Sequence, residues 1–149
     1  MLKISHRGNI KGPVPEEENK PKYIFQALQQ NYDCELDFWV IDQKFFLGHD
    51  EPRYEIDYEF FENNSAKLWI HCKNLAALDY LVSNSRNKNI FNFFWHENDK
   101  FTLTSKLFIW TYPNQPFKKS RILVNLGLPS EYITSGDIAG VCSDSISFY

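Results

Sequence analysis

Residues 33–50 read DCELDFWVIDQKFFLGHD. Apolar and polar side chains alternate with a period of two from residue 34 to residue 41, which predicts a β-strand. One face of this strand would be apolar, and the other would carry Glu35, Asp37 and Trp39. Because two carboxylates beside a tryptophan are unusual on an open surface, the stretch predicts a core on one side of a sheet and a site on the other.

The second half of the same stretch returns along the first half. Residues 42–44 are predicted as a turn, and residues 45–48 as a second extended segment. With a three-residue loop, Ile41 faces Phe45 and Asp37 lies opposite His49. The hairpin would then bring this histidine back to the carboxylates.

The rest of the N-terminal half alternates strands and helices, which predicts a parallel α/β sheet. We expect a strand over residues 2–6, a loop over residues 11–20, a helix from Pro21 to about Tyr32, a polar surface excursion over residues 51–66, a strand over residues 67–72 and a helix over residues 75–84.

After residue 87 the sequence favours strands joined by turns. Strands are expected over residues 90–95, 107–112, 122–126 and 140–143, with one short helix over residues 130–133. An eight-fold (β/α) barrel needs about 200 to 250 residues, and this chain has 149. We therefore predict a single α/β domain over residues 1–149, built as a reduced TIM-barrel-like (β/α) barrel that lacks several outer helices.

A barrel without some of its helices leaves apolar outer faces uncovered, and such faces often form subunit contacts. Four aromatic residues lie close together at Phe91, Phe93, Phe94 and Trp95. We hypothesise on this basis that the protein forms a homodimer through the side that lacks helices.

Composition narrows the classes of partner and compartment. A net charge of −3 gives no field that would attract a polyanion, which argues against nucleic-acid binding. The three cysteines, Cys34, Cys72 and Cys142, stand singly in apolar runs and are expected to be buried thiols in a reducing compartment. The first strand begins too early for a signal segment, and the longest apolar run is too short to cross a bilayer. We expect a cytoplasmic protein without a membrane span.

Four short motifs occur in order between His6 and Asp50. They are His6-Arg7-Gly8, Glu18-Asn19, Glu35-Leu36-Asp37 and His49-Asp50. In order and spacing they resemble the opening of the glycerophosphodiester phosphodiesterase family. That family usually has Glu-x-Lys on the next strand, whereas this chain has His71-Cys72-Lys73 and departs at the first position.

The resemblance implies a phosphoric diester hydrolase with a bound divalent metal ion, Mg²⁺ or Ca²⁺, and a small phosphodiester as its substrate. It also implies a role for each matching residue. The implied assignments are His6 and His49 for catalysis, Arg7 and Lys73 for the substrate phosphate, Glu18, Glu35, Asp37 and His71 for the metal, and Trp110 for the wall of the substrate pocket.

These residue types suit that chemistry. Two carboxylates at i and i+2 on a strand point to the same side, as a hard divalent cation requires. A histidine at position 71 binds Mg²⁺ and Ca²⁺ poorly and would favour a softer ion such as Mn²⁺. Histidines titrate near neutral pH, so His6 and His49 could exchange protons with the substrate. The planar guanidinium of Arg7 suits two phosphate oxygens.

Each assignment has a structural alternative. The acidic pair could be the solvated face of its strand, and His71 could be a hydrogen-bonded core histidine. Glu18 could orient Arg7 instead of binding the metal, and Trp110 could be a core residue. His96, which follows an aromatic strand, could join the cleft, but we expect it to be a turn histidine outside the site.

The function implied by the resemblance is hydrolysis through a cyclic phosphate, in which a neighbouring hydroxyl of the glycerol attacks phosphorus. A phospholipase D of the sphingomyelinase type is an alternative, because it also uses two histidines and an E-x-D motif. A catalytically inactive barrel that binds a phosphorylated ligand is a second alternative, which the short chain and His71 keep open.

Overall fold

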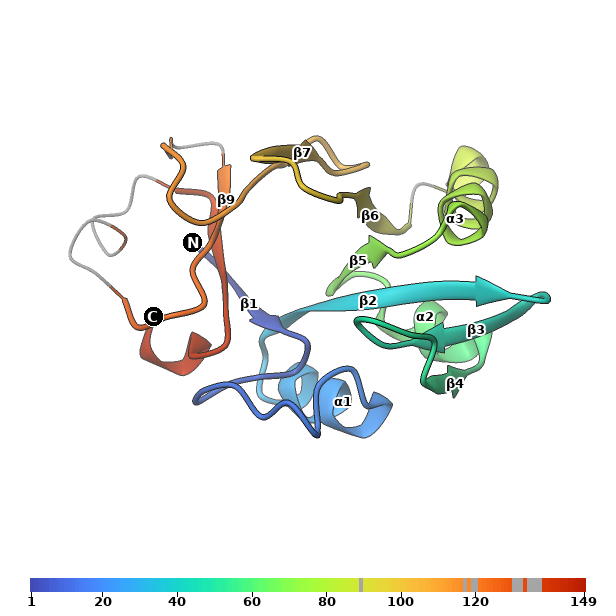
Figure 1. Ribbon diagram of the computed structural model, residues 1–149, viewed down its shortest axis with the longest axis horizontal. Coiled ribbons are helices and arrows are strands. Elements are labelled where there is room, and N and C mark those ends of the chain that lie inside the picture. The colour runs from blue at the N-terminus through green and yellow to red at the C-terminus, as the bar shows by residue number, and fades with distance from the viewer. Residues whose placement is uncertain (89, 117, 119–120, 130–132, 134–137) are drawn as a thin grey trace.

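The computed structural model spans residues 1–149 and describes all of them except 89, 117, 119–120, 130–132 and 134–137 (Figure 1). The described elements are β1 (Leu2–His6), α1 (Pro21–Gln29), β2 (Asp33–Ile41), β3 (Lys44–Leu47), β4 (Tyr54–Ile56), α2 (Tyr58–Asn64), β5 (Leu68–Cys72), α3 (Leu75–Lys88), β6 (Asn92–Trp95), β7 (Phe101–Leu103), β8 (Ile109–Thr111), β9 (Arg121–Val124), β10 (Gly140–Ser143) and the 3₁₀ turn η1 (Ile146–Phe148).

Parallel pairing joins most of the strands into one curled sheet. The parallel order is β6-β5-β2-β1-β10-β9-β8, while β7 pairs antiparallel with β8, and β3 and β4 form an antiparallel extension of β2. Figure 1 shows the strands curling round an open centre with α1 and α3 outside them. The fold is therefore a mixed α/β fold with a barrel-like sheet and few helices.

The two ends of the curled sheet approach each other beside β6. The Ser105 amide donates to the Phe93 carbonyl at 2.8 Å, and the Thr102 hydroxyl donates to the Trp95 carbonyl at 2.8 Å. These bonds connect β6, at one end of the parallel strand order, to β7 and to the residues that follow β7, at the other end. They therefore stabilise the curled shape of the sheet.

The period of two in β2 sorts its side chains as expected. Leu36 and Phe38 are fully buried in a core on the helix-covered side, while Glu35 and Asp37 are buried on the inner side. The inner face also holds an aromatic cluster. Its buried members are Ile4, Trp69, Phe94, Trp110, Ile122, Val124 and Cys142.

The predicted hairpin is present, but its register is wrong by one residue. Ile41 pairs with Lys44 and Phe38 pairs with Leu47, because the turn contains only two residues, Asp42 and Gln43. Both have positive φ, 48° and 64°, which is the geometry of a tight hairpin turn whose twist matches the flanking strands. The Asp37 carbonyl therefore accepts from the amide of Gly48 instead of facing His49.

The segment over residues 51–66 is more than a surface excursion. It contains β4, which extends the hairpin, and α2, whose first turn is capped where the Asp57 carboxylate accepts from the Phe60 amide at 2.9 Å. Phe61 on this helix is 1% exposed and packs edge-on against Phe38. The polar composition of this segment did not predict α2, whose aromatic face covers the core.

Other bounds differ modestly from the predicted ones. Helix α3 continues to Lys88, and the short strand β7 was not predicted. In α1, Ile24, Ala27 and Leu28 are buried, whereas Phe25 is 48% exposed. The predicted short helix over residues 130–133 lies largely outside the described residues.

The four aromatic residues that motivated the homodimer hypothesis pack inside the protein. Phe91, Phe93 and Phe94 are at most 8% exposed, and Trp95 packs partly buried against the same core. The homodimer stays a prediction without this support. All three cysteines are free and buried as expected, and burial raises the pKa of the Cys72 thiol to about 12. Among the described residues, no helix has the length and apolar character needed to cross a bilayer.

Close strand packing at Gly140 gives a test of the curled sheet. Gly140 lies opposite Leu2, and an added Cβ would approach the Leu2 Cβ to 2.7 Å. We expect Gly140→Ala to lower the free energy of unfolding by about 1–3 kcal/mol, measured by urea denaturation followed by circular dichroism. Gly127→Ala is the matched control, because its nearest atom lies at 3.8 Å. Equal stability of the two variants would contradict the β1–β10 packing.

Candidate active site

The candidate site lies where several parallel strands end. His6 ends β1, and Asp144 follows the neighbouring strand β10. Glu35 and Asp37 lie on the inner face of β2, which pairs with β1, and His71 lies beside them on β5. Register explains this meeting, because His6 pairs with Glu35 and Asp37 pairs with His71. Carboxyl ends of parallel strands form one edge, so polar residues from distant parts of the chain converge there.

His6 is held by a carboxylate that sequence reasoning did not assign. Its Nδ1 lies 2.7 Å from Asp144 Oδ1, and its Nε2 lies 3.9 Å from Glu35 Oε2. Because a carboxylate only accepts, Nδ1–H is the donor and Nε2 faces the inside of the site. Burial alone would lower the pKa of His6, but the Asp144 hydrogen bond and the Glu35 charge outweigh it and raise that pKa.

Asp37 is the most constrained carboxylate of the site. The Asn19 side-chain amide donates to Oδ2 at 2.9 Å, while Asn19 Oδ1 accepts from the Asp37 main-chain amide at 2.9 Å. Arg7 Nε lies 3.0 Å from Oδ2, and Lys73 Nζ lies 3.6 Å from Oδ1. Burial alone would raise the pKa of Asp37, but His71 and Arg7 hold it well below its usual range.

Glu18 orients Arg7 from the loop that precedes α1. Its Oε2 lies 3.1 Å from Arg7 Nη1, and its Oε1 accepts from the Asn9 amide at 2.8 Å. The same Asn9 nitrogen lies 2.8 Å from Asp144 Oδ1, so Asn9 connects the two carboxylates. The structure thus places Glu18 beside the guanidinium, as the alternative assignment proposed.

His71 presents a nitrogen lone pair to two carboxylates. Its Nε2 lies 3.2 Å from the main-chain carbonyl of His96, which can only accept, so Nε2 carries a proton. Its Nδ1 lies 3.0 Å from Asp37 Oδ1 and 3.9 Å from Glu35 Oε1. In the neutral ring, three electron-rich atoms therefore face one another, and a proton or a cation must lie between them.

This arrangement fits a divalent cation. One ligand atom from each of Glu35, Asp37 and His71 lies within 4.8 Å of the others. Glu35 Oε2 is buried without a hydrogen-bond partner among the described residues. Metal-binding histidines commonly donate their second N–H to a carbonyl, as His71 does. Glu18 does not belong to this group of three.

The local charge balance also favours a bound cation. Four carboxylates, those of Glu18, Glu35, Asp37 and Asp144, face two permanent cations, Arg7 and Lys73. The excess is two negative charges when all of these are ionised and the histidines are neutral, and one negative charge when His6 is protonated. Burial, together with the Asp37 charge, raises the pKa of Glu35. A bound cation would favour the ionised form of this carboxylate and so would offset that shift.

A cavity of about 220 Å³ opens over these groups and is lined by His6, Arg7, Glu35, His49 and His71. The two histidines predicted to exchange protons therefore border one space. His49 is the more exposed, and its Nδ1 lies 2.7 Å from Asp50 Oδ1. Burial lowers the pKa of His49, and Arg7 lowers it further against the opposing charge of Asp37.

A second cavity of about 220 Å³ adjoins the first one. It shares Arg7 and His49 with the first cavity and adds Glu18, Asp50 and Arg53. The two spaces could hold the two arms of one ligand. Part of the first cavity's remaining wall is aromatic, because Phe94, Trp110 and Tyr112 line it.

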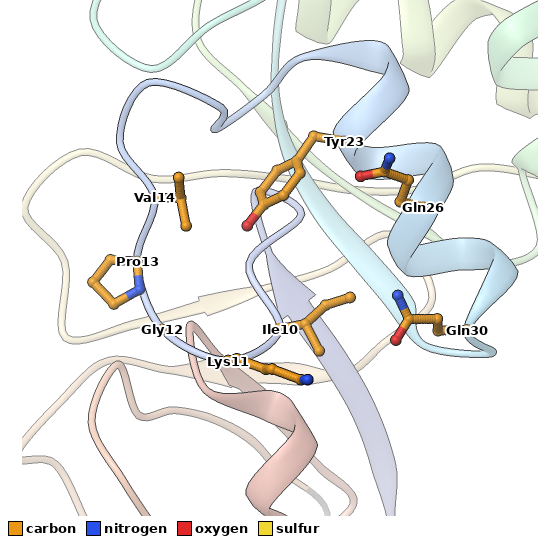
Figure 2. Close-up of a pocket in the computed structure, with 8 residues that line it drawn as sticks. All are labelled: Ile10, Lys11, Gly12, Pro13, Val14, Tyr23, Gln26 and Gln30. Carbon is orange, nitrogen blue, oxygen red and sulfur yellow. The ribbon is translucent and has the colours of Figure 1, made fainter.

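A separate hollow of about 400 Å³ lies between the loop over residues 10–14 and α1 (Figure 2). Figure 2 shows Tyr23 and Gln26 on α1 and Gln30 just after its end, all beside the hollow. Its lining contains no histidine and no carboxylate. It therefore lacks the groups needed for acid–base or metal chemistry.

Most of the predicted site residues come together, with two qualifications. Lys73 lies against Asp37, and Trp110 both lines the cavity and packs in the aromatic cluster, with its ring 4.8 Å from that of Phe94. Glu18 is the first qualification, since it binds Arg7. His49 is the second, since it is the more exposed of the two predicted catalytic histidines.

Sequence reasoning missed four residues of the site. Asp144 and Asn9 hold His6 and Glu18, while His96 and Tyr112 border the cavity. Asp144 had a usable signal, because it directly follows a strand in a parallel sheet. His96 was expected in a turn outside the site, but it lines the cavity wall. Comparison of the chain with family models, curated proteins and solved structures yields no match.

Removing one carboxylate tests the metal centre. We expect Glu35→Gln to weaken Mn²⁺ binding by at least about tenfold, because the site loses a charged oxygen ligand. Isothermal titration calorimetry of the metal-free protein measures this affinity. Glu55→Gln is the matched control, because Glu55 pairs with Lys44 on an exposed hairpin edge. Wild-type protein without saturable Mn²⁺ binding would contradict the assignment.

Proposed function

We propose that the protein is a metal-dependent phosphodiesterase similar to the glycerophosphodiester phosphodiesterases, and that its curled sheet is a reduced TIM-barrel-like (β/α) barrel. The observation that carries this proposal is the meeting of His71 Nδ1 with Asp37 and Glu35 beside His6 in one cavity. A divalent cation held there by Glu35, Asp37 and His71 would supply positive charge for the oxygens of a phosphodiester.

Arg7 would bind the phosphate and fix its orientation. Two of its nitrogens are already held by Glu18 and Asp37, so the guanidinium plane is fixed and can direct its remaining N–H groups into the cavity. A fixed donor costs little conformational entropy when the ligand binds. Lys73, held close to Asp37, adds a second positive charge.

The two histidines would move the protons. In the first step a hydroxyl beside the phosphoester attacks phosphorus, and its proton passes to a neutral imidazole. The bond from phosphorus to the departing alcohol breaks, and the alcohol oxygen takes a proton from the protonated imidazole. The products are a cyclic phosphate and an alcohol, and water then opens the ring with the two roles reversed.

His6 and His49 have the different environments that this exchange requires. Asp144 holds His6 in one tautomer and favours its protonated form, whereas His49 lies partly exposed beside Arg7, which favours its neutral form. Pairs of titratable groups with opposed environments are typical of acid–base catalysis.

A phospholipase with the same site is a second candidate, and one observation favours it. Leu126 lines the cavity and is 41% exposed, and Leu128, two residues further, is 67% exposed. Apolar side chains at the mouth of a site are suited to a lipid substrate. A lysophospholipid therefore belongs among the substrates that are tested.

The proposal predicts a defined hydrolysis product. Phosphorus NMR with glycerophosphoethanolamine, glycerophosphocholine and a lysophospholipid, each with Mg²⁺, Ca²⁺ or Mn²⁺, should show a phosphomonoester or a transient cyclic phosphate. We expect His6→Ala and His49→Ala each to lower the rate at least about 100-fold, with unchanged circular dichroism. Lys44→Ala, on the exposed edge of the same hairpin, is the control. Full activity of His49→Ala would exclude the two-histidine mechanism.

A further inference from the structure

Two aromatic side chains line the cavity but take no part in the proposed proton transfers. His96 follows β6 and Tyr112 follows β8, and both border the space that contains His6 and Glu35. Their rings are stacked, with centroids 3.6 Å apart and planes inclined by 21°. The pair therefore forms one rigid part of the cavity wall.

Each ring has a polar atom that the described residues leave without a partner. The Tyr112 hydroxyl is buried and accepts or donates no hydrogen bond within the described part of the chain, and the same is true of His96 Nδ1. Asp99 Oδ2 lies 4.0 Å from this nitrogen, which is too far for a hydrogen bond. A buried polar group without a partner is costly, so a ligand that supplies one is favoured.

Tyr112 lines the same cavity as Glu35. Burial raises the pKa of Tyr112 far above its usual range, and the Glu35 charge raises it further. The phenol therefore stays protonated and is available as a donor. Arg7, the proposed phosphate-binding residue, lines this cavity too.

Main-chain bonds fix the position of both residues. The Tyr112 amide donates to the Lys100 carbonyl at 3.1 Å, and the His96 carbonyl accepts from His71 Nε2 at 3.2 Å. The wall is thus tied directly to a candidate metal ligand. Donors held in place before binding discriminate between ligands more sharply than mobile ones.

We propose that Tyr112 and His96 form a hydroxyl-binding subsite that selects the polyol arm of the substrate. The Tyr112 hydroxyl donates to one substrate hydroxyl, and His96 Nδ1 accepts from a substrate hydroxyl in the tautomer protonated at Nε2. The other arm of the diester then occupies the second cavity, beyond Arg7 and His49. This assignment rests on the proposed function for the identity of the substrate, but its test uses binding alone.

Two phosphate monoesters of equal carbon number separate the hydroxyl contribution from phosphate binding. Glycerol 3-phosphate carries two hydroxyls, and propyl phosphate carries none. Isothermal titration calorimetry with Mn²⁺ present should give at least about tenfold tighter binding of glycerol 3-phosphate to the wild type, because a site built for a hydroxyl rejects the analogue without it. Tyr112→Phe should reduce the preference to about twofold or less, with propyl phosphate affinity unchanged.

Matched variants keep this test decisive. Tyr80→Phe is the control, because Tyr80 packs against Phe45 on the outer side and should leave the preference intact. His96→Phe keeps the stacked ring, removes Nδ1 and should also reduce the preference, which provides a second variant if Tyr112→Phe fails to fold. An equal affinity of the wild type for both monoesters, or no binding of either, would overturn the subsite.

The outcomes distinguish this inference from the proposed function. Hydrolysis of phosphodiesters together with a preference that Tyr112→Phe leaves unchanged would remove the subsite and leave the phosphodiesterase. A preference that Tyr112→Phe abolishes, in a protein that hydrolyses nothing, would support the subsite in a binding protein and remove the phosphodiesterase.

Discussion

The carboxylate of Asp37 organises the site and a large part of the chain around it. Its side chain is fully buried, and it is contacted by Asn19, Arg7, His71 and Lys73, which come from three separate segments. A buried charge is tolerated only where such partners surround it, and removal of one partner from a buried ion pair typically costs about 3–5 kcal/mol. The loop before α1, the turn after β1 and the end of β5 therefore have to arrive together for the fold to be stable.

Strand β2 makes this convergence possible because neighbours occupy both of its edges. Its first residues pair with β1 and its last residues pair with β3, while β5 runs along the opposite edge. The same strand buries Phe38 toward the helices and Asp37 toward the inside of the curl. The period-two alternation of β2 thus places core residues on one face and site residues on the other. The acidic face is buried because the sheet curls around it.

The chemical character of the site follows from what His71 faces. If the ring only filled space, a hydrogen bond to the His96 carbonyl would be enough, and its second nitrogen would have no need to meet two carboxylates. The arrangement instead concentrates negative charge and lone pairs at one point beside His6, under a cavity walled by aromatic rings. Such a site suits a cation and an anionic ligand together, and this is the basis on which a phosphodiester is proposed as the substrate.

The sequence by itself determined most of the strands, though not β4 and β7, together with the α/β class and the residues that would share a face with Glu35 and Asp37, because side-chain periodicity depends only on local backbone geometry. Only the tertiary structure decided the two-residue hairpin turn, the helix within residues 51–66, the pairing of Glu18 with Arg7, and the arrival of Asp144 at His6. These depend on loop conformation and on contacts between residues far apart in the chain. The pattern of side chains along the sequence does not reveal such contacts. Where burial and charge pairing between distant residues contribute more free energy than local preferences, a polar segment can form a helix that packs on the core.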